Sequence, residues 1–230
     1  KFQMDFHLKT DASWLEVPQF FTLAHGERSF TVKVDPSILK PGSFSHTMIY
    51  AYDVTCAEKG PVFKFPVTVM KPLNTVEHSI NGKAKPGCLR RTFFQIPQNA
   101  RSCRISVENL DKNNAGRFVL HSSFQVPDRS WSKYDFSKNF ELKPNGSVDY
   151  QFDVFGNYTL EVCFGKFWSN LGESDYKLTV KFDQINLADT SGSVVIASNN
   201  ITRFNLCNYG ENPLRVRPEV SFRELVQSFK

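Results

Sequence analysis

The chain has 230 residues, of which 40% are hydrophobic and 22% charged, and 22 of them are Phe. This composition excludes a disordered chain and leaves room for one large or two modest domains, each with its own core. No run approaches the ~20 consecutive apolar residues of a membrane helix, so no membrane partner is expected.

The formal charge of +5 would suit nucleic acid if it were concentrated. Basic residues are instead spread singly along the chain, and the nearest approach to a cluster is Arg90-Arg91 with Arg101 and Arg104 nearby. Such a spread is typical of a solvated sheet face, so we expect no nucleic acid partner.

Alternation of apolar and polar residues with a period of two dominates residues 1–72. It is clear at 2–8, 30–34 and 63–69. Asp35-Pro36 ends one run, and Pro41-Gly42 turns the chain into another run around Met48, Tyr50 and Tyr52. Five or six short strands at this spacing predict a small immunoglobulin-like or fibronectin-like β-sandwich over residues 1–72.

A second block of alternating runs follows "MKPLNTVEH", and we place a domain boundary near Pro72. Residues 73–230 are predicted to form a larger antiparallel sandwich, jelly-roll-like in strand number. The fold class is therefore all-β with two sandwich domains. The nine expected strands are Arg90–Ile96, Cys103–Val107, Arg117–Phe124, Phe136–Leu142, Val148–Val154, Tyr158–Phe164, Tyr176–Phe182, Val194–Ile196 and Ile201–Leu206.

Two shorter features complete this block. Asn145-Gly146 is a strong turn pair, and Phe155-Gly156-Asn157 separates the run 148–154 from the run 158–164, which predicts that these two runs form a hairpin. Near the end, Glu219–Phe229 has helical spacing and is either a short helix or a further strand.

Motifs for catalysis, cofactors and metals are missing. The sequence has no GxSxG elbow, no Gly-Thr-Ser frame and no glycine-rich phosphate loop. Asp149 and Asp153 are expected on the outward side of a strand, where a solvated face explains them. The histidines have no metal-ligand spacing. We expect His7 and His25 at the surface and His121 partly buried in a structural role, the full set being His7, His25, His46, His78 and His121.

Cysteines and glycosylation sequons point to opposite compartments. The five cysteines, an odd and scattered set, are Cys56, Cys88, Cys103, Cys163 and Cys207. Cys103 and Cys163 lie in apolar runs and are predicted to be buried free thiols, which favours a reducing compartment. Three sequons begin at Asn145, Asn157 and Asn200. The first two stand at good turn positions, so backbone conformation accounts for the asparagines there.

Aromatic residues in or beside loops offer one binding hypothesis. Trp131, Tyr134, Phe167 and Trp168 have the residue types of a carbohydrate-binding platform on a β-sandwich. The alternative is that each plugs an end of the sandwich or meets a neighbouring domain.

Six segments in order, "ASWLEVP", "VDPSILKPGSFSHTMIYAYD", "GPVFKFPVTVMKP", "FVLHSSFQV", "VCFGKFWSNLGESDYKLTV" and "NITRFNL", extend over essentially the whole chain. Together they resemble the region that follows the protease domain in the tripeptidyl-peptidase II family. None of the six is a catalytic signature. The start at Lys1 inside an alternating run, without a signal-peptide layout, agrees with a segment of a larger soluble protein.

The resemblance implies a parent that is a cytosolic serine exopeptidase of the subtilisin clan. It implies removal of tripeptides from free N-termini of oligopeptides, assembly into very large complexes, and a helical region beyond Lys230. The family's Asp, His and Ser and its amine-anchoring acidic residues belong to the preceding domain, and none maps onto this chain. We therefore expect no catalytic, cofactor-binding or metal-binding residue here, and the oligopeptide to bind elsewhere.

Two functions from different classes follow. In the first, the chain is a non-catalytic segment that contacts the protease domain and the C-terminal region of the same polypeptide and supports a homo-oligomer in the cytoplasm. In the second, it is an extracellular carbohydrate- or ligand-binding sandwich that uses Trp131, Tyr134 and Trp168.

Overall fold

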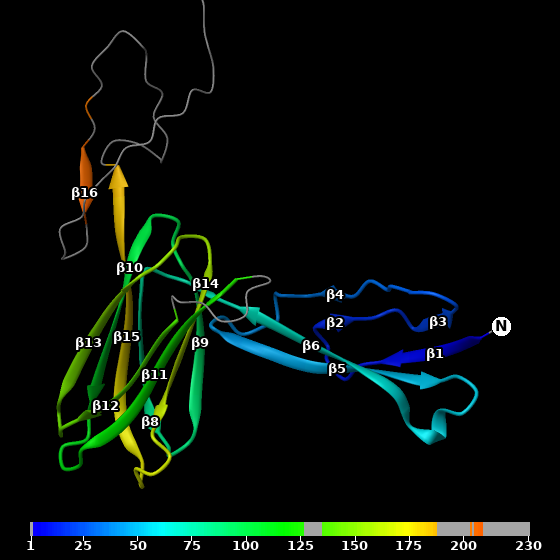
Figure 1. Ribbon diagram of the computed structural model, residues 1–230, viewed down its shortest axis with the longest axis horizontal. Helices are drawn as coiled ribbons and strands as arrows, with labels where there is room; N and C mark the ends of the chain where they lie inside the picture. The colour runs from blue at the N-terminus through cyan, green and yellow to red at the C-terminus, as the bar shows by residue number, and fades with distance from the viewer. Residues whose placement is uncertain (1, 127–134, 188–202, 204, 209–230) are drawn as a thin grey trace, which may run out of the picture.

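The computed structural model describes residues 2–126, 135–187, 203 and 205–208. Within these residues the regular structure is β-strand apart from one short 3-10 helix, so the all-β prediction is confirmed. Two β-sandwiches lie end to side, and the strands of the first run across the direction of those in the second (Figure 1). The molecule is therefore elongated, with one sandwich projecting from the flank of the other.

The first sandwich packs a four-stranded antiparallel sheet, in the order β3-β1-β5-β6, over the short pair β2-β4. Asp35-Pro36 and Pro41-Gly42 flank the connection into β5, as predicted, and β6 is an edge strand that tolerates Pro66. The elements are β1 (Gln3–Lys9), β2 (Leu15–Glu16), β3 (Phe20–Ala24), β4 (Lys33–Val34), β5 (Ser43–Asp53), η1 (Ala57–Lys59) and β6 (Pro61–Lys71).

The core of the first sandwich is small and aromatic. Its five buried members are Phe6, Leu8, Leu15, Ile49 and Ala51. Phenylalanine rings extend this core toward one edge through edge-on contacts, Phe21 to Phe30 at 5.3 Å and Phe30 to Phe65 at 5.4 Å between ring centroids. Phe30 precedes β4, so the strand expected at 30–34 is reduced to its last two residues.

The second sandwich packs two larger sheets face to face. One is ordered β13-β10-β15-β16, with β8 also pairing β15, and the other is β12-β11-β14-β9-β7. The elements are β7 (Leu73–Asn74), β8 (Glu77–Ala84), β9 (Leu89–Gln95), β10 (Ala100–Asn109), β11 (Gly116–Gln125), β12 (Phe136–Leu142), β13 (Ser147–Asp153), β14 (Thr159–Lys166), β15 (Ser174–Leu187) and β16 (Leu206–Asn208).

A continuous core fills the space between these sheets. Nineteen buried residues belong to it, including Phe94, Phe118, Leu160 and Phe182, each at most 1% exposed. Successive residues of β14 are buried, and β11 and β9 pair with its two edges. Burial on this scale is what a sandwich of this size needs for independent stability.

The predicted hairpin of 148–154 with 158–164 is wrong. Both runs are strands, but β13 pairs with β10 in one sheet and β14 pairs with β11 and β9 in the other. The connection 154–158 therefore crosses between sheets. Gly156 approaches the backbone so closely that an added Cβ would stand 2.2 Å from the Gln98 carbonyl oxygen, which fixes the crossing.

The Asn145-Gly146 turn is present and also joins strands of different sheets, β12 and β13. Gly146 N donates to Lys143 O at 2.9 Å, and Asn145 has a left-handed φ of 56° after Pro144. Strand β8 was not predicted. The expected strand 194–196, half of the expected strand 201–206 and the segment 219–229 lie outside the described residues.

Candidate functional site

Histidine contacts in the described residues are structural. His46 Nδ1 lies 2.8 Å from Thr68 Oγ1, and His25 Nε2 accepts a hydrogen bond from Phe2 N at 3.5 Å. His7 stacks on Phe20 and His78 meets Phe94 edge-on. His7 and His78 are as half-buried as His121, so the expectation that only His121 is partly buried is wrong.

The carboxylates considered for hydrolysis lie where the alternation predicted. Asp149 and Asp153 are exposed on the outward side of β13. The buried carboxylate on this side of the molecule is Asp183, which accepts hydrogen bonds from Ser102 Oγ at 2.9 Å and Gln151 Nε2 at 3.4 Å. These bonds compensate its burial, and it forms no pair with either exposed aspartate.

All five cysteines are free, and Cys103 and Cys163 are buried as predicted. Burial raises the pKa of the Cys103 thiol, and the carboxylate of Asp183 raises it further. Burial also raises the pKa of the Cys163 thiol, against the opposing effect of Arg91. Both thiols are therefore poor nucleophiles at neutral pH.

Metal and membrane features are lacking in the part of the chain that the structure describes. No group of three or more His, Cys, Asp or Glu residues converges there as a metal site would require. No helix of sufficient length and apolarity to cross a bilayer occurs in the same residues.

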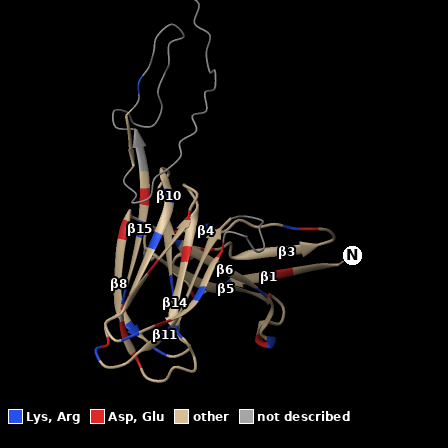
Figure 2. Cartoon of the chain, turned by 60° about the vertical axis from the view of Figure 1, so that its left-hand side comes forward, with Lys and Arg blue, Asp and Glu red and all other residues tan. Residues whose placement is uncertain are grey.

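The arginines singled out as the nearest basic cluster lie on strands of different sheets, Arg90 and Arg91 on β9 and Arg101 and Arg104 on β10. Arg91 Nη1 is 3.0 Å from Glu161 Oε1, and Gln125 Nε2 donates to the same carboxylate at 3.0 Å. Glu161 is buried but the Arg91 side chain is half-exposed, so this ion pair lies at the surface of β9 and β14. Lys and Arg residues elsewhere are scattered among Asp and Glu over both sandwiches (Figure 2).

The joint between the two sandwiches is a specific contact. Phe93 N donates to Gly42 O at 3.1 Å, and the rings of Phe44 and Phe93 meet edge-on with centroids 6.2 Å apart. Phe93 is 2% exposed although it belongs to neither core. Gly42 has a φ of 77°, and a Cβ there would stand 2.8 Å from Leu73, so glycine is required on both grounds.

A second ordered feature is the loop that follows β14. Lys166 is 3% exposed, and its Nζ donates to Leu171 O at 3.1 Å, to Gly172 O at 3.0 Å and to Ser174 Oγ at 2.9 Å. Burial lowers the pKa of this amine, an effect that the charge of Asp111 opposes. Lys166 thereby fixes the far end of the loop 167–173.

Contacts from β11 hold the near end of the same loop. Phe167 N donates to Arg117 O at 2.8 Å, Asn170 Oδ1 accepts from Arg117 N at 3.1 Å, and the Arg117 guanidinium lies 4.2 Å from the centre of the Phe167 ring. The loop presents Trp168, 73% exposed, and Leu171, 84% exposed. Trp131 and Tyr134, proposed with Trp168 as a platform, lie outside the described residues.

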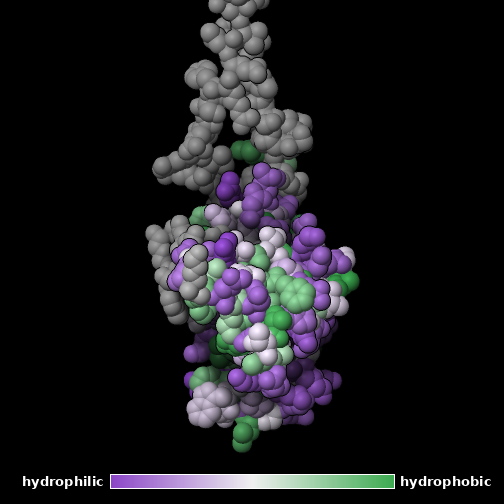
Figure 3. Space-filling model, turned by 90° about the vertical axis from the view of Figure 1, so that its right-hand side faces the viewer, coloured by the Kyte–Doolittle hydropathy of each residue, from purple (hydrophilic) through white to green (hydrophobic). Residues whose placement is uncertain are grey.

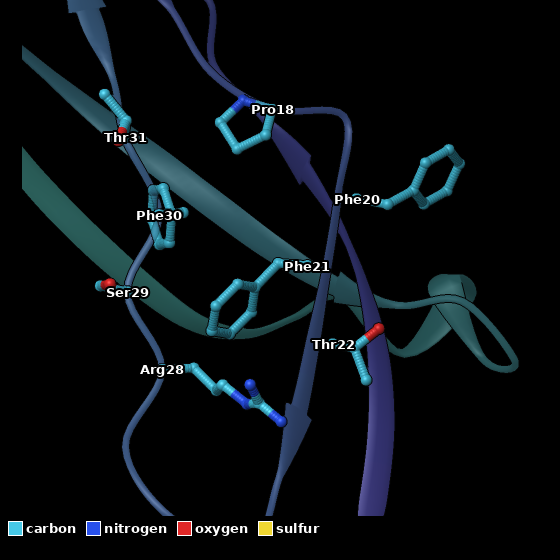
Figure 4. Close-up of a pocket in the computed structure, with 8 residues that line it drawn as sticks. All are labelled: Pro18, Phe20, Phe21, Thr22, Arg28, Ser29, Phe30 and Thr31. Atoms are coloured by element: carbon cyan, nitrogen blue, oxygen red, sulfur yellow. The ribbon is translucent and has the colours of Figure 1, made fainter.

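An open groove runs along the edge of the first sandwich, between β3 and residues 28–31. Phe21 and Phe30 point toward one another across it, whereas Phe20 points away from the groove (Figure 4). Figure 3 looks at this end of the molecule and shows hydrophobic residues gathered within a hydrophilic surround. The groove contains one cationic side chain, Arg28, and no carboxylate, so it offers no acid–base pair.

Sequence reasoning missed the residues that organise these features. Lys166 reads as an ordinary lysine in an alternating run, and its partners are loop carbonyls that carry no sequence signal. Gly42 was recognised as a turn glycine, and its left-handed conformation is the local part of its role. Its second role, close approach to Leu73, depends on how the two sandwiches meet.

Comparisons with known proteins agree with this two-part architecture. Residues 1–70 match the family model described as the first Ig-like domain of tripeptidyl-peptidase II. Residues 84–172 match the model described as the galactose-binding domain-like part of the same family.

Relatives and a solved structure point the same way. The chain is 28% identical to tripeptidyl-peptidase 2 of Drosophila melanogaster, over 90% of this chain and 16% of the relative. It is 27% identical to that of Caenorhabditis elegans, over 100% of this chain and 17% of the relative. A crystal structure of tripeptidyl peptidase 2 superimposes with a TM-score of 0.71 and 26% identity, over 83% of this chain and 17% of that one.

The chain thus spans about one sixth of the length of the curated relatives it matches. These comparisons agree on one family. Two of its models match in sequence order, its members align over most of the chain, and the structural match includes both sandwiches. The chain belongs to the tripeptidyl-peptidase II family and forms part of its β-rich region.

Proposed function

We propose that this chain is a non-catalytic scaffold within a tripeptidyl-peptidase II-like serine exopeptidase that removes tripeptides from the N-termini of oligopeptides. It supports the protease domain and the assembly of a cytoplasmic homo-oligomer. The observation that carries the proposal is the joint, where Gly42, Phe44, Leu73 and Phe93 hold two sandwiches in one arrangement. A fixed joint holds the domains on either side of it in a defined relative position. A serine mechanism needs this because its catalytic groups must be held to fractions of an ångström.

The histidine contacts support the same proposal. In the described residues no histidine is hydrogen-bonded to a carboxylate or to a serine hydroxyl, the arrangement that an activated serine requires. The buried polar groups Lys166, Glu161 and Asp183 are all engaged within the fold. The protein's reactive groups are thus proposed to belong to the remainder of the polypeptide.

The test compares two glycine variants in the full-length polypeptide. Gly42→Ala and Gly26→Ala both place a side chain on a left-handed backbone, at φ of 77° and 94°, but only the first meets a neighbour. We expect Gly42→Ala to lower the rate of tripeptide release from an oligopeptide, and Gly26→Ala to leave it near the parent value. Equal rates for both variants would contradict a positional role for the joint.

A carbohydrate-binding function has one observation in its favour, the exposure of Trp168 on a sandwich that matches a galactose-binding domain-like model. The polar groups nearby argue against it, because Lys166 Nζ already donates to loop carbonyls, Asn170 Oδ1 already accepts from Arg117 N, and Leu171 adds an apolar neighbour. Titration of galactose against the tryptophan fluorescence of a Trp14→Phe variant, which keeps Trp131 and Trp168, separates the two functions. A saturable change would favour the binding module.

A further inference from the structure

The outward side of the first sandwich's main sheet is unusually aromatic. In an antiparallel sheet with one face on a core, the other face is normally polar. Strand register instead places several aromatic and other apolar side chains on that side, mostly along β5, and we call it the outer face of the first sheet. Beyond two rows at one end, Gln3 with Ala24 and Asp5 with Thr22, its rows, read across β3, β1, β5 and β6, are Phe20, His7 and Tyr52; Lys9, Tyr50 and Lys64; Met48 and Pro66; His46 and Thr68; and Phe44 and Met70.

These side chains contact one another and still leave surface uncovered. His7 stacks on Phe20 at 5.3 Å, Lys9 Nζ lies 5.5 Å from the centre of the Tyr52 ring, and Lys64 Nζ lies 5.4 Å from that of Tyr50. Phe20 is 59% exposed. The result is an ordered aromatic stripe with two lysines on it.

The second sandwich supplies the contrast within one chain. The outward positions of β10 are Ser102, Arg104, Ser106 and Glu108, and those of β13 are also polar. Solvent exposure alone thus gives a polar outer face in this protein. Strand β5 differs because Ile49 and Ala51 face the core while Met48, Tyr50 and Tyr52 face outward, the composition of a strand covered on both sides.

One end of the stripe touches another domain. Phe44, in its last row, contacts Phe93 of the second sandwich and is still 48% exposed, next to the hydrogen bond from Phe93 N to Gly42 O. The outer face is therefore continuous with an interface between domains of one polypeptide. The curated relatives are about six times longer than this chain, so the same polypeptide has further domains available to cover the rest.

We propose that the outer face of the first sheet is the docking surface for a folded domain of the same polypeptide outside residues 1–230. The partner presents an apolar centre to Met48, Tyr50 and Tyr52, and carboxylates at its rim to Lys9 and Lys64. This proposal rests on the proposed function, because it takes the chain as part of a longer enzyme. It names a surface that the comparison of Gly42→Ala with Gly26→Ala does not probe.

The experiment uses the full-length polypeptide. Hydroxyl-radical footprinting compares oxidation of Met48, Tyr50 and Tyr52 in the native and the urea-unfolded protein. Carbodiimide cross-linking, which joins lysines to carboxylates in direct contact, then identifies what faces Lys9 and Lys64. Cross-linked peptides are recovered separately from the monomer and dimer bands of a denaturing gel, since only bonds within one polypeptide remain in the monomer band.

Strong protection of the three side chains, with Lys9 or Lys64 joined in the monomer band to an Asp or Glu outside residues 1–230, is the expected result. Oxidation of Met48 at the unfolded rate overturns the proposal, as do cross-links confined to the dimer band, which would assign the face to a second copy. Protection without any such cross-link overturns the acidic rim. None of these results depends on whether Gly42→Ala changes tripeptide release.

A matched pair of variants adds a readout of assembly. Met48→Glu places a charge on the outer face of the first sheet, and Asn81→Glu places the same charge on the polar outer face of the second sandwich, opposite Lys177. We expect Met48→Glu to increase oxidation of Tyr50 and Tyr52 in the full-length protein at least several-fold, while Asn81→Glu leaves it unchanged. Equal protection in both variants would contradict the proposal.

Discussion

The two sandwiches of this chain differ in the size of their buried cores and in the polarity of their outer surfaces. Among the described residues the second has nineteen buried members in one core, whereas the first has five and continues into half-exposed phenylalanines beside an open groove. The outer surface differs in the opposite sense, polar on the second sandwich and aromatic on the first. We infer that the second sandwich is self-sufficient and that the first relies on its neighbours for burial.

Core truncation should give the largest difference between the sandwiches. Phe94 is fully buried in the second core and contacts Phe182, with ring centroids 6.1 Å apart. We expect Phe94→Ala to lower the free energy of unfolding of that sandwich by about 3–5 kcal/mol, because it removes a large buried ring and leaves a cavity. Phe65→Ala, at a ring already 39% exposed, should cost only about 1 kcal/mol in the first.

The free energy of unfolding of both variants is measured by urea unfolding, monitored by far-UV circular dichroism. A Trp131→Phe, Trp168→Phe background leaves Trp14 as the sole tryptophan, and Trp14 packs against the first core. Its fluorescence therefore reports the first sandwich separately. Equal losses for Phe94→Ala and Phe65→Ala would contradict the comparison, and Phe94→Leu provides a milder version if the alanine variant fails to fold.

Removal of a buried polar anchor should come next in size. Lys166→Met keeps most of the side-chain volume but leaves Leu171 O and Gly172 O without their donor. We expect a loss of about 1–3 kcal/mol in the stability of the second sandwich, with none in the first. Hydrogen exchange should also show faster exchange in residues 167–173.

Lys85→Met is the matched control, because that lysine forms an exposed ion pair with Glu173 at 3.3 Å on the same side of the molecule. Its stability should stay within about 0.5 kcal/mol of the parent. If Lys166→Met were equally neutral, the lysine would not be the anchor of the loop.

One buried hydroxyl that faces the second core, among the residues that the structure describes, has no hydrogen-bond partner, and its removal should stabilise this sandwich. Ser122 is 1% exposed, and its Oγ has no hydrogen-bond partner. Ser122→Ala removes this unpaired hydroxyl, so we expect a gain of about 1 kcal/mol in the second sandwich. Ser123→Ala, at the neighbouring outward position of β11, is the control and should give no gain. A loss in Ser122→Ala would show that the hydroxyl is bonded in solution.

Local alternation predicted most of the strands but not how they are arranged. Runs 148–154 and 158–164 are both strands, and the three-residue connection between them made a hairpin the natural expectation. Gly156 allows the connection to press against Gln98 and cross to the opposite sheet. Nothing in the residues near 155–158 distinguishes a turn within a sheet from a crossing between sheets, because that choice depends on which strands are available for pairing.

The candidate surfaces show the same limit. The sequence identified Trp168 and the run around Tyr50 and Tyr52, but not which side of that run faces the core, since both sides are apolar. The positions of Gly42 against Leu73 and of Lys166 against the loop carbonyls arise from long-range packing. Period-two patterns identify the strands and the buried free cysteines within them. Contacts between sheets and between domains are seen only in the structure.

Acid should affect the first sandwich more than the second. In the first, hydrogen bonds from Ser37 lower the pKa of Asp35, and hydrogen bonds from Thr55 lower the pKa of Asp53. Among the described residues of the second, Asp111 alone has a carboxyl pKa lowered in this way, by hydrogen bonds from Asn113 and Asn114. A carboxyl whose pKa is lower when folded contributes stability above its unfolded pKa, near 3.9, and loses it as the pH falls through the folded value.

Stability of the first sandwich should therefore be constant from about pH 7 to about pH 5 and decrease below about pH 4. The measurement is the urea midpoint of Trp14 fluorescence, in the background without the other two tryptophans, at several pH values. An Asp35→Asn, Asp53→Asn variant keeps an oxygen acceptor at each turn and does not titrate, so its midpoint should decrease less on acidification. If the variant followed the parent curve, these two turns would not be the source of the acid sensitivity, and the first sandwich would owe it to charges elsewhere on its surface.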